Sequence, residues 1–290
     1  MSERPSRLLK AKLAERRALL VPGVPNALTA LIAADLGYEA VYVTGAGVTN
    51  MSLGMPDLGL ITLSELAEHV RAIREITELP IIVDADTGFG NAVNVHRTVK
   101  VLEHAGASAI QLEDQVFPKK CGHFEGKEVV PLDEMLPKIR AALDARTDPD
   151  LQIVARTDAR AIVGIDQAIE RAAAFIEAGA DVTFVEAPQT IEEMRAITSR
   201  LSAVPQLANL VVGGKTPVLP QPALREMGFA VALYANVALQ SAVKAMQGVL
   251  SALLRDGSLD AVRDQVASFT ERQRLVQKPR FDALEQKYRS

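Results

Sequence analysis

The chain alternates short β-branched runs with longer stretches of helical hydrophobic periodicity, and it does so about eight times. The helical stretches have recognisable ends, such as the capping box formed by Thr62 and Glu65. Apolar strands separated by helices are typical of a parallel sheet that is covered on both faces. The candidate strands lie at residues 18–23, 40–46, 80–86, 109–114, 152–158, 181–187, 206–212 and 231–236.

Eight β/α units in 290 residues predict an α/β fold of the closed (β/α)8 TIM-barrel type. The alternative is an open, doubly wound sheet, but residues 86–94 (DTGFGNAVN) lack the third glycine of a dinucleotide fingerprint. No low-complexity linker divides the chain, so we expect one domain over residues 1–290, with 259–290 as a helical extension. This extension either packs on a neighbouring subunit or covers the barrel's own outer face.

The composition favours a cytoplasmic protein that acts on small molecules. With 32 basic and 36 acidic residues the net charge is -4, which argues against nucleic acid or an anionic membrane as the main partner. The first 20 residues indicate an amphipathic helix rather than a signal peptide. Polar residues such as Lys244 and Gln247 interrupt the most apolar stretch, residues 230–254, and argue against a transmembrane helix. The single cysteine, Cys121, excludes an internal disulfide and favours a reducing compartment.

Polar residues gather where the predicted strands end. In a TIM barrel these C-terminal ends meet at one mouth, where the chemistry takes place. Convergence of so many polar groups predicts an active site there. In chain order the strand ends carry Tyr42, Thr44, Gly45, Ala46, Asp84, Asp86, Thr87, Glu113, Asp114, Arg156, Thr157, Asp158, Glu186 and Asn209.

Four carboxylates form a predicted acidic cluster at this mouth. Asp84 and Asp86 are two residues apart and therefore share one face of their strand. Glu113 ends the next strand, and Asp57 lies in a nearby loop. Carboxylates held close together repel one another unless a cation neutralises them or their pKa values rise. Oxygen ligands favour a hard ion such as Mg2+, whereas the alternative role of the aspartates is helix N-capping.

Arg156 lies on the same rim. Its guanidinium suits bidentate binding of a substrate carboxylate. The alternative is a structural ion pair with Glu186 or Asp158.

Cys121 lies in a long loop, rich in glycine and lysine, after the fourth strand. The length of this loop predicts a mobile lid. Lys119, Lys120 and His123 would lower the pKa of the thiol and attract an anionic substrate. The alternative is a surface cysteine without a function.

Five segments together resemble the isocitrate lyase/phosphoenolpyruvate mutase superfamily: VTGAGVTNMSLGMPDLG, DADTGFGN, LEDQVFPKKCGH, ARTDA and VEAP. The similarity extends from about Leu19 to the C-terminal helices. It implies a Mg2+-dependent (β/α)8 barrel, with Mn2+ as an alternative ion, that makes or breaks C–C or P–C bonds of 2-oxo and 2-hydroxy acids. It also implies a homotetramer in which a C-terminal helix is swapped between subunits.

Within this superfamily the cysteine of K-[KR]-C-G-H marks the lyase branch. Residues 209–217 read NLVVGGKTP, which differs from the N-I-T-E-F-G-x-T-P pattern of methylisocitrate lyases. Gln240 stands where those enzymes have a substrate-binding arginine. Both departures favour a malate-like dicarboxylate over a tricarboxylate.

The resemblance therefore implies a Mg2+-dependent carbon–carbon lyase. It would cleave a substituted 2-hydroxy dicarboxylate, of the 2,3-dimethylmalate or 2-methylisocitrate type, into a 2-oxo acid such as pyruvate and a carboxylate. The alternatives are carboxyphosphonoenolpyruvate or phosphoenolpyruvate mutase chemistry, an oxaloacetate hydrolase, and a catalytically silent binding barrel. The metal ligands that it implies are Asp84, Asp86, Glu113 and Asp57. The catalytic residues that it implies are Cys121 as general acid, Arg156, Glu186 and Tyr42. The substrate-binding residues that it implies are Thr44, Gly45, Ala46, Gly122, His123, Arg156, Glu186 and Asn209.

Overall fold

The computed structural model describes residues 3–120 and 126–289. Eight parallel strands follow the order β6-β5-β4-β3-β2-β1-β8-β7. A parallel bridge between Thr183 and Gln206 links β6 to β7, so the sheet forms a nearly closed barrel and the predicted (β/α)8 fold is confirmed. The strands are β1 (Leu19–Val24), β2 (Val41–Val43), β3 (Ile81–Asp84), β4 (Ala109–Glu113), β5 (Gln152–Thr157), β6 (Val182–Val185), β7 (Leu207–Asn209) and β8 (Val231–Tyr234).

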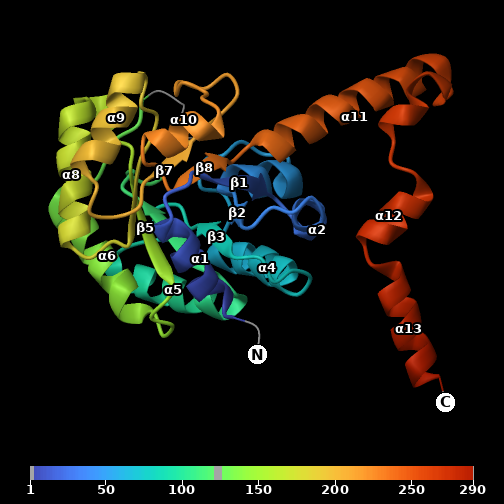
Figure 1. Ribbon diagram of the computed structural model, residues 1–290, viewed down its shortest axis with the longest axis horizontal. Coiled ribbons are helices and arrows are strands. Elements are labelled where there is room, and N and C mark those ends of the chain that lie inside the picture. Colours follow the sequence, from blue (N-terminus) through green and yellow to red (C-terminus); the bar gives the residue numbers. More distant parts are fainter. Residues whose placement is uncertain (1–2, 121–125, 290) are drawn as a thin grey trace.

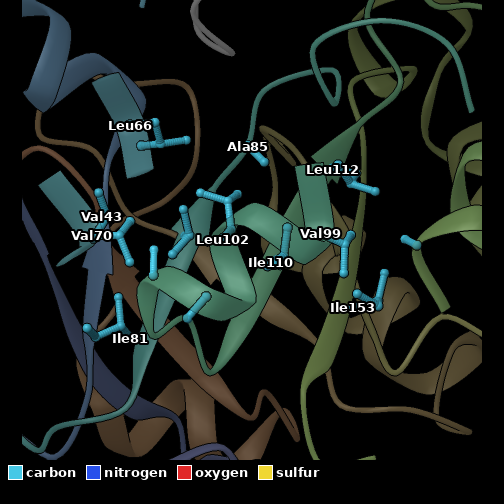
Figure 2. Packing of buried hydrophobic residues seen from close by; sticks show 14 of the residues in the cluster. Val43, Leu66, Val70, Ile81, Ala85, Val99, Leu102, Ile110, Leu112 and Ile153 are labelled. Carbon is cyan, nitrogen blue, oxygen red and sulfur yellow. The ribbon is translucent and has the colours of Figure 1, made fainter. Parts of the chain in front are cut away.

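Helices surround the strands because each presents one apolar face to the barrel. In α4 (Leu63–Arg74) that face includes the buried Leu66 and Val70, and the predicted capping box of Thr62 and Glu65 is present. Figure 2 shows such side chains packed against those that point outward from the strands, including Ile81, Ile110 and Ile153. The other helices around the barrel are α2 (Ala27–Asp35), α5 (Ala92–Ala105), α6 (Leu132–Ala145), α8 (Ile165–Glu177), α9 (Ile191–Arg200) and α10 (Gln221–Glu226).

The N-terminal end of the barrel is closed by α1 (Pro5–Ala14). Leu9 and Leu13 of this helix are buried in one cluster with inward-facing strand residues such as Val21 and Ile82. This packing confirms the predicted amphipathic helix and leaves the opposite, C-terminal mouth as the open end. Three short helical segments shape that mouth: α3 (Gly45–Val48), the π-helical turn η1 (Thr49–Leu53) and α7 (Arg160–Val163).

The last part of the chain leaves the barrel. Figure 1 shows α11 (Val237–Asp256) pointing away from the strands, although it follows β8 and is eighth in the β/α order. Its one buried residue is Ala252. Among the described helices, α11 alone has the length and apolar composition that crossing a membrane would need, and Lys244 and Gln247 interrupt it.

The segments after α11 are η2 (Asp260–Gln265), α12 (Phe269–Leu275) and α13 (Lys278–Tyr288). Arg274 of α12 donates hydrogen bonds to both carboxylate oxygens of Asp35, each at 2.7 Å, so α12 lies beside the end of α2. The departure from the barrel thus begins at α11, upstream of residue 259.

Candidate active site

A small cavity opens at the C-terminal ends of the strands. Side chains from β2 to β8 or from the residues just after them line it, which is where the barrel argument placed the chemistry. Nine of the residues selected from the sequence line the cavity: Tyr42, Thr44, Ala46, Asp57, Asp84, Glu113, Arg156, Glu186 and Asn209.

Asp84 and Asp86 face the backbone of Gly45. A Cβ atom on Gly45 would lie 3.2 Å from Asp86 Oδ1 and 3.4 Å from Asp84 Oδ2. Gln111 Nε2 donates to Asp84 Oδ1 at 3.2 Å and helps to fix that carboxylate. Thr44, just before Gly45, is the N-cap of α3. The missing side chain at Gly45 therefore leaves a small space directly in front of two carboxylates.

Lys119 joins the acidic cluster from the β4–α6 loop. Its Nζ lies 2.5 Å from Asp57 Oδ1 and 2.8 Å from Asp86 Oδ1, and 4% of its side chain is exposed. From the sequence, Lys119 was expected to lie near the thiol of Cys121, and no contact with the carboxylates was predicted. No local pattern could have done so, because Asp57 and Lys119 are 62 residues apart in the chain.

Burial shifts the pKa values of this cluster. It raises the pKa of Asp86 to about 6, even though the Lys119 charge acts in the opposite direction. Burial also raises the pKa of Glu113 well above its usual range, against the opposing effect of Arg156. For Lys119, burial lowers the pKa, but Asp86 and Glu113 outweigh it, and the net shift is well upward. Lys119 is therefore charged at neutral pH.

The acidic cluster offers oxygen donors that suit a hard cation. Glu113 Oε1 is buried without a hydrogen-bond partner among the described residues, and the space at Gly45 adjoins Asp84 and Asp86. Over residues 3–120 and 126–289, no three His, Cys, Asp or Glu side chains converge closely enough to enclose an ion. The carboxylate oxygens nonetheless suit an ion such as Mg2+, which uses few protein ligands and keeps several waters.

Arg156 forms the structural ion pairs that were expected as its alternative role. Nε donates to Asp158 Oδ2 at 2.8 Å and Nη2 to Asp158 Oδ1 at 3.1 Å. Nη1 lies 3.5 Å from Glu186 Oε2. The guanidinium also stacks over Phe184, 5.1 Å from the ring centroid, and lines the cavity. These ion pairs therefore hold the guanidinium of Arg156 at the mouth, in a position to meet an anionic ligand.

Tyr42 and two asparagines complete the polar lining. Burial and the Asp84 carboxylate raise the pKa of Tyr42 well above its usual value, so the phenol stays protonated. Asn209 Oδ1 and Asn236 Oδ1 are buried without hydrogen-bond partners among the described residues. Asn236 was not among the site residues predicted from the sequence, although its position just after β8 places it at the mouth of the barrel.

Cys121, Gly122 and His123 lie outside the described residues, so their predicted roles stay predictions. The residues on either side are anchored at the mouth. Gln115 binds the main chain of Lys120, accepting from its N at 2.9 Å and donating to its O at 2.8 Å. On the other side, Lys127 Nζ donates to Asp158 Oδ1 at 2.7 Å.

Comparison with known proteins identifies relatives of this barrel. The family described as phosphoenolpyruvate phosphomutase matches residues 9–254. The chain is 44% identical over 280 residues to 2,3-dimethylmalate lyase of Eubacterium barkeri, covering 97% of this chain and 96% of that protein. It is 46% identical over 269 residues to 2-methylisocitrate lyase of Aeropyrum pernix, covering 93% and 86%.

A solved structure with the same fold contains ligands. Phosphonopyruvate hydrolase in complex with oxalate and Mg2+ superposes with a TM-score of 0.89 at 33% sequence identity, and the match covers 99% of each chain. The similarity therefore extends over the whole barrel, including the strands that carry the acidic cluster and Arg156.

Proposed function

The chain belongs to the phosphoenolpyruvate phosphomutase family, within the isocitrate lyase/phosphoenolpyruvate mutase superfamily, and from this we propose that it is a carbon–carbon lyase. Its substrate is a substituted 2-hydroxy dicarboxylate of the 2,3-dimethylmalate type, with the 2-methylisocitrate type as the nearest variant. The products are a 2-oxo acid such as pyruvate and a carboxylate. Two relatives that cover most of the chain are lyases of these two kinds.

One observation supports this reaction above the others: buried carboxylates and a buried guanidinium line one small cavity. Asp84, Glu113 and Arg156 are all part of its lining. A dicarboxylate with a hydroxyl group needs both. One end requires a cation held by carboxylates, and the other carboxylate requires a guanidinium.

Asp84, Asp86, Glu113 and Asp57 would hold Mg2+, which when bound would lower the pKa of the substrate hydroxyl and stabilise the charge that develops on oxygen. The carboxylate oxygens of these residues suit a hard divalent cation, and Mn2+ is an alternative ion. Phosphonopyruvate hydrolase, which is similar to this chain, has been solved with Mg2+.

The protein groups orient the substrate around that centre. Arg156 binds one carboxylate, and Glu186 and Asn209 position the same end of the molecule. At the other end, the main chain of Gly45 and Ala46 and the hydroxyl of Thr44 contact the substrate, and the protonated phenol of Tyr42 donates a hydrogen bond. Gly122 and His123 complete the substrate contacts.

Cleavage transfers two protons and one electron pair. The hydroxyl proton passes to a carboxylate of the acidic cluster. The C–C bond breaks as the hydroxyl becomes the carbonyl of the 2-oxo acid. The released carbon holds the electron pair as an enolate-type carboxylate, and the thiol of Cys121 protonates it as general acid.

The exposed C-terminal helices support a homotetramer in which α11 is exchanged between subunits in the cytoplasm. Several of its apolar side chains have no cover within the described part of one chain, since Met246, Leu250 and Leu254 are 48%, 60% and 89% exposed. A second copy supplies the apolar surface that such a helix requires.

A Mg2+-dependent cleavage screen with product identification tests the proposed reaction. The substrates are malate, 2,3-dimethylmalate, 2-methylisocitrate and oxaloacetate, assayed with Mg2+ and with a chelator. We expect pyruvate from 2,3-dimethylmalate, and loss of that product in the chelator. Acetate and oxalate from oxaloacetate as the dominant products would instead assign the chain to the hydrolases.

A further inference from the structure

Lys119 is the cation that balances part of the acidic cluster. Its Nζ bridges Asp57 and Asp86 at 2.5 and 2.8 Å. Within the described residues these two aspartates form no other ion pair, since Arg156 pairs with Glu113, Asp158 and Glu186. The ammonium thus supplies the positive charge that two buried carboxylates need.

Contacts to the neighbouring main chain and to the side-chain stem hold Lys119 in place. The amide side chain of Gln115 binds both the N and the O of Lys120, the next residue, which fixes the main chain at this point. The stem of Lys119 then passes Gly59, where a Cβ atom would lie 3.6 Å from Lys119 Cγ. The long side chain is therefore directed inward, and its residue is only 3% exposed.

The ammonium also competes for the oxygen atoms that a metal would use. Asp86 Oδ1 contacts Lys119 and is the same atom that adjoins the space at Gly45. A divalent cation and an ammonium cannot both lie within contact distance of this atom without strong mutual repulsion.

From these contacts we propose that Lys119 is an internal counter-cation, which holds Asp57 and Asp86 together in the metal-free protein and which a divalent cation displaces when it binds. This inference rests on the metal site of the proposed function. It adds that metal affinity is set by an exchange of one cation for another. Lys119 is a positioning residue in this role, because it acts on the carboxylates and not on the reacting atoms.

Isothermal titration of the chelator-treated protein with MgCl2 tests the exchange without any substrate. Lys119→Met keeps the length of the side chain and removes its charge, so Mg2+ no longer has to displace an ammonium. We expect Mg2+ to bind this variant about 5- to 150-fold more tightly, the usual range for coupling between two binding events. The metal-free variant should also melt at a lower temperature than the wild type, and Mg2+ should raise its melting temperature further.

Lys10→Met is the matched control, because Lys10 Nζ also pairs with a carboxylate, Asp150 Oδ1 at 3.2 Å, but lies on α1 at the opposite end of the barrel. It should bind Mg2+ as the wild type does. If Lys119→Met fails to fold, Lys119→Gln, which is also uncharged but keeps a polar end, takes its place in the same titration.

Unchanged or weaker Mg2+ binding by Lys119→Met, beside a wild type that binds Mg2+ and turns over substrate, would overturn the exchange and leave the proposed lyase intact. Absence of Mg2+ binding by the wild type would overturn both the exchange and the metal site. Tighter binding in Lys119→Met, with no change in Lys10→Met, supports the exchange.

Discussion

Arg156 and Asp158 form a buried bidentate pair, with Nε–Oδ2 and Nη2–Oδ1 distances of 2.8 and 3.1 Å. The Asp158 side chain is fully buried, and its Oδ1 also accepts from Lys127 at 2.7 Å. One carboxylate thus fixes the arginine that lines the cavity and the lysine that follows residues 121–125. This arrangement ties the cavity-lining guanidinium of Arg156 to the β4–α6 loop.

Asp158→Asn removes the charge that two buried cations share. We expect the free energy of unfolding to fall by roughly 3–5 kcal/mol, the usual effect of deleting one partner of a buried ion pair. Urea unfolding of the metal-free protein measures this change. Asp166→Asn is the control, because Asp166 also pairs with an arginine, Arg200, but its side chain is 80% exposed. That variant should change stability by less than about 1 kcal/mol. Equal effects of the two substitutions would contradict the importance of the buried pair.

The Asp158 carboxylate should also make stability depend on pH. Burial alone would raise its pKa, but Arg156 and Lys127 outweigh it and lower the pKa from 3.8 to about 2. A carboxylate with a lowered folded-state pKa stabilises the fold above its unfolded pKa, and this contribution is lost as the pH falls toward the folded value. The stability difference between wild type and Asp158→Asn should therefore be constant from pH 7 to about pH 5 and shrink below about pH 4. Urea unfolding at a series of pH values measures it, and a difference that grows on acidification would contradict this assignment.

The sequence predicted most of the barrel because strand and helix periodicities are local. All eight strands formed at the predicted places, with β1 extending one residue beyond its range to Val24, and polar strand ends such as Asp84 and Glu113 meet at one cavity as expected. The contact between Lys119 and Asp57 was not predictable, since it joins two loops whose conformations depend on the whole mouth. The direction of α11 was also not predictable, because its amphipathic pattern fits its own barrel or another subunit equally well.

Gly45→Ala should weaken metal binding without unfolding the barrel. The new Cβ would lie 3.2 Å from Asp86 Oδ1 and 3.4 Å from Asp84 Oδ2, in the space in front of both carboxylates. We expect Mg2+ affinity to fall about 10- to 100-fold, as for other changes next to metal ligands. Titration calorimetry measures the affinity, and circular dichroism checks the fold. Gly248→Ala in α11 is the control, since its Cβ would be 3.9 Å from the nearest atom outside the helix, Gln265 Oε1. Wild-type affinity in Gly45→Ala would place the metal elsewhere.

Cys121→Ser tests the proposed general acid. A hydroxyl group is a much weaker acid than a thiol, so protonation of the released carbon should become slow. Turnover of the best substrate should fall about 10²–10⁴-fold, the usual contribution of a positioned acid or base. Mg2+ affinity and binding of the 2-oxo acid product, both measured by calorimetry, should stay unchanged. Turnover at the wild-type rate would remove Cys121 from the mechanism.

Leu254→Asp should dissociate the proposed tetramer. Leu254 is 89% exposed and lies on one stripe of α11 with Val243, Met246 and Leu250, which are 42%, 48% and 60% exposed. A charge on this stripe would be buried without a partner against the second subunit, which is strongly unfavourable. Size-exclusion chromatography with light scattering should show a smaller species at micromolar concentration. Ala245→Asp adds the same charge to the same helix but at an exposed position on the side away from the stripe, and it should keep the wild-type mass. A wild type that is already monomeric would overturn the tetramer. Equal masses for the two variants would show that another surface covers α11, because an exchanged helix cannot tolerate a charge at its most apolar contact.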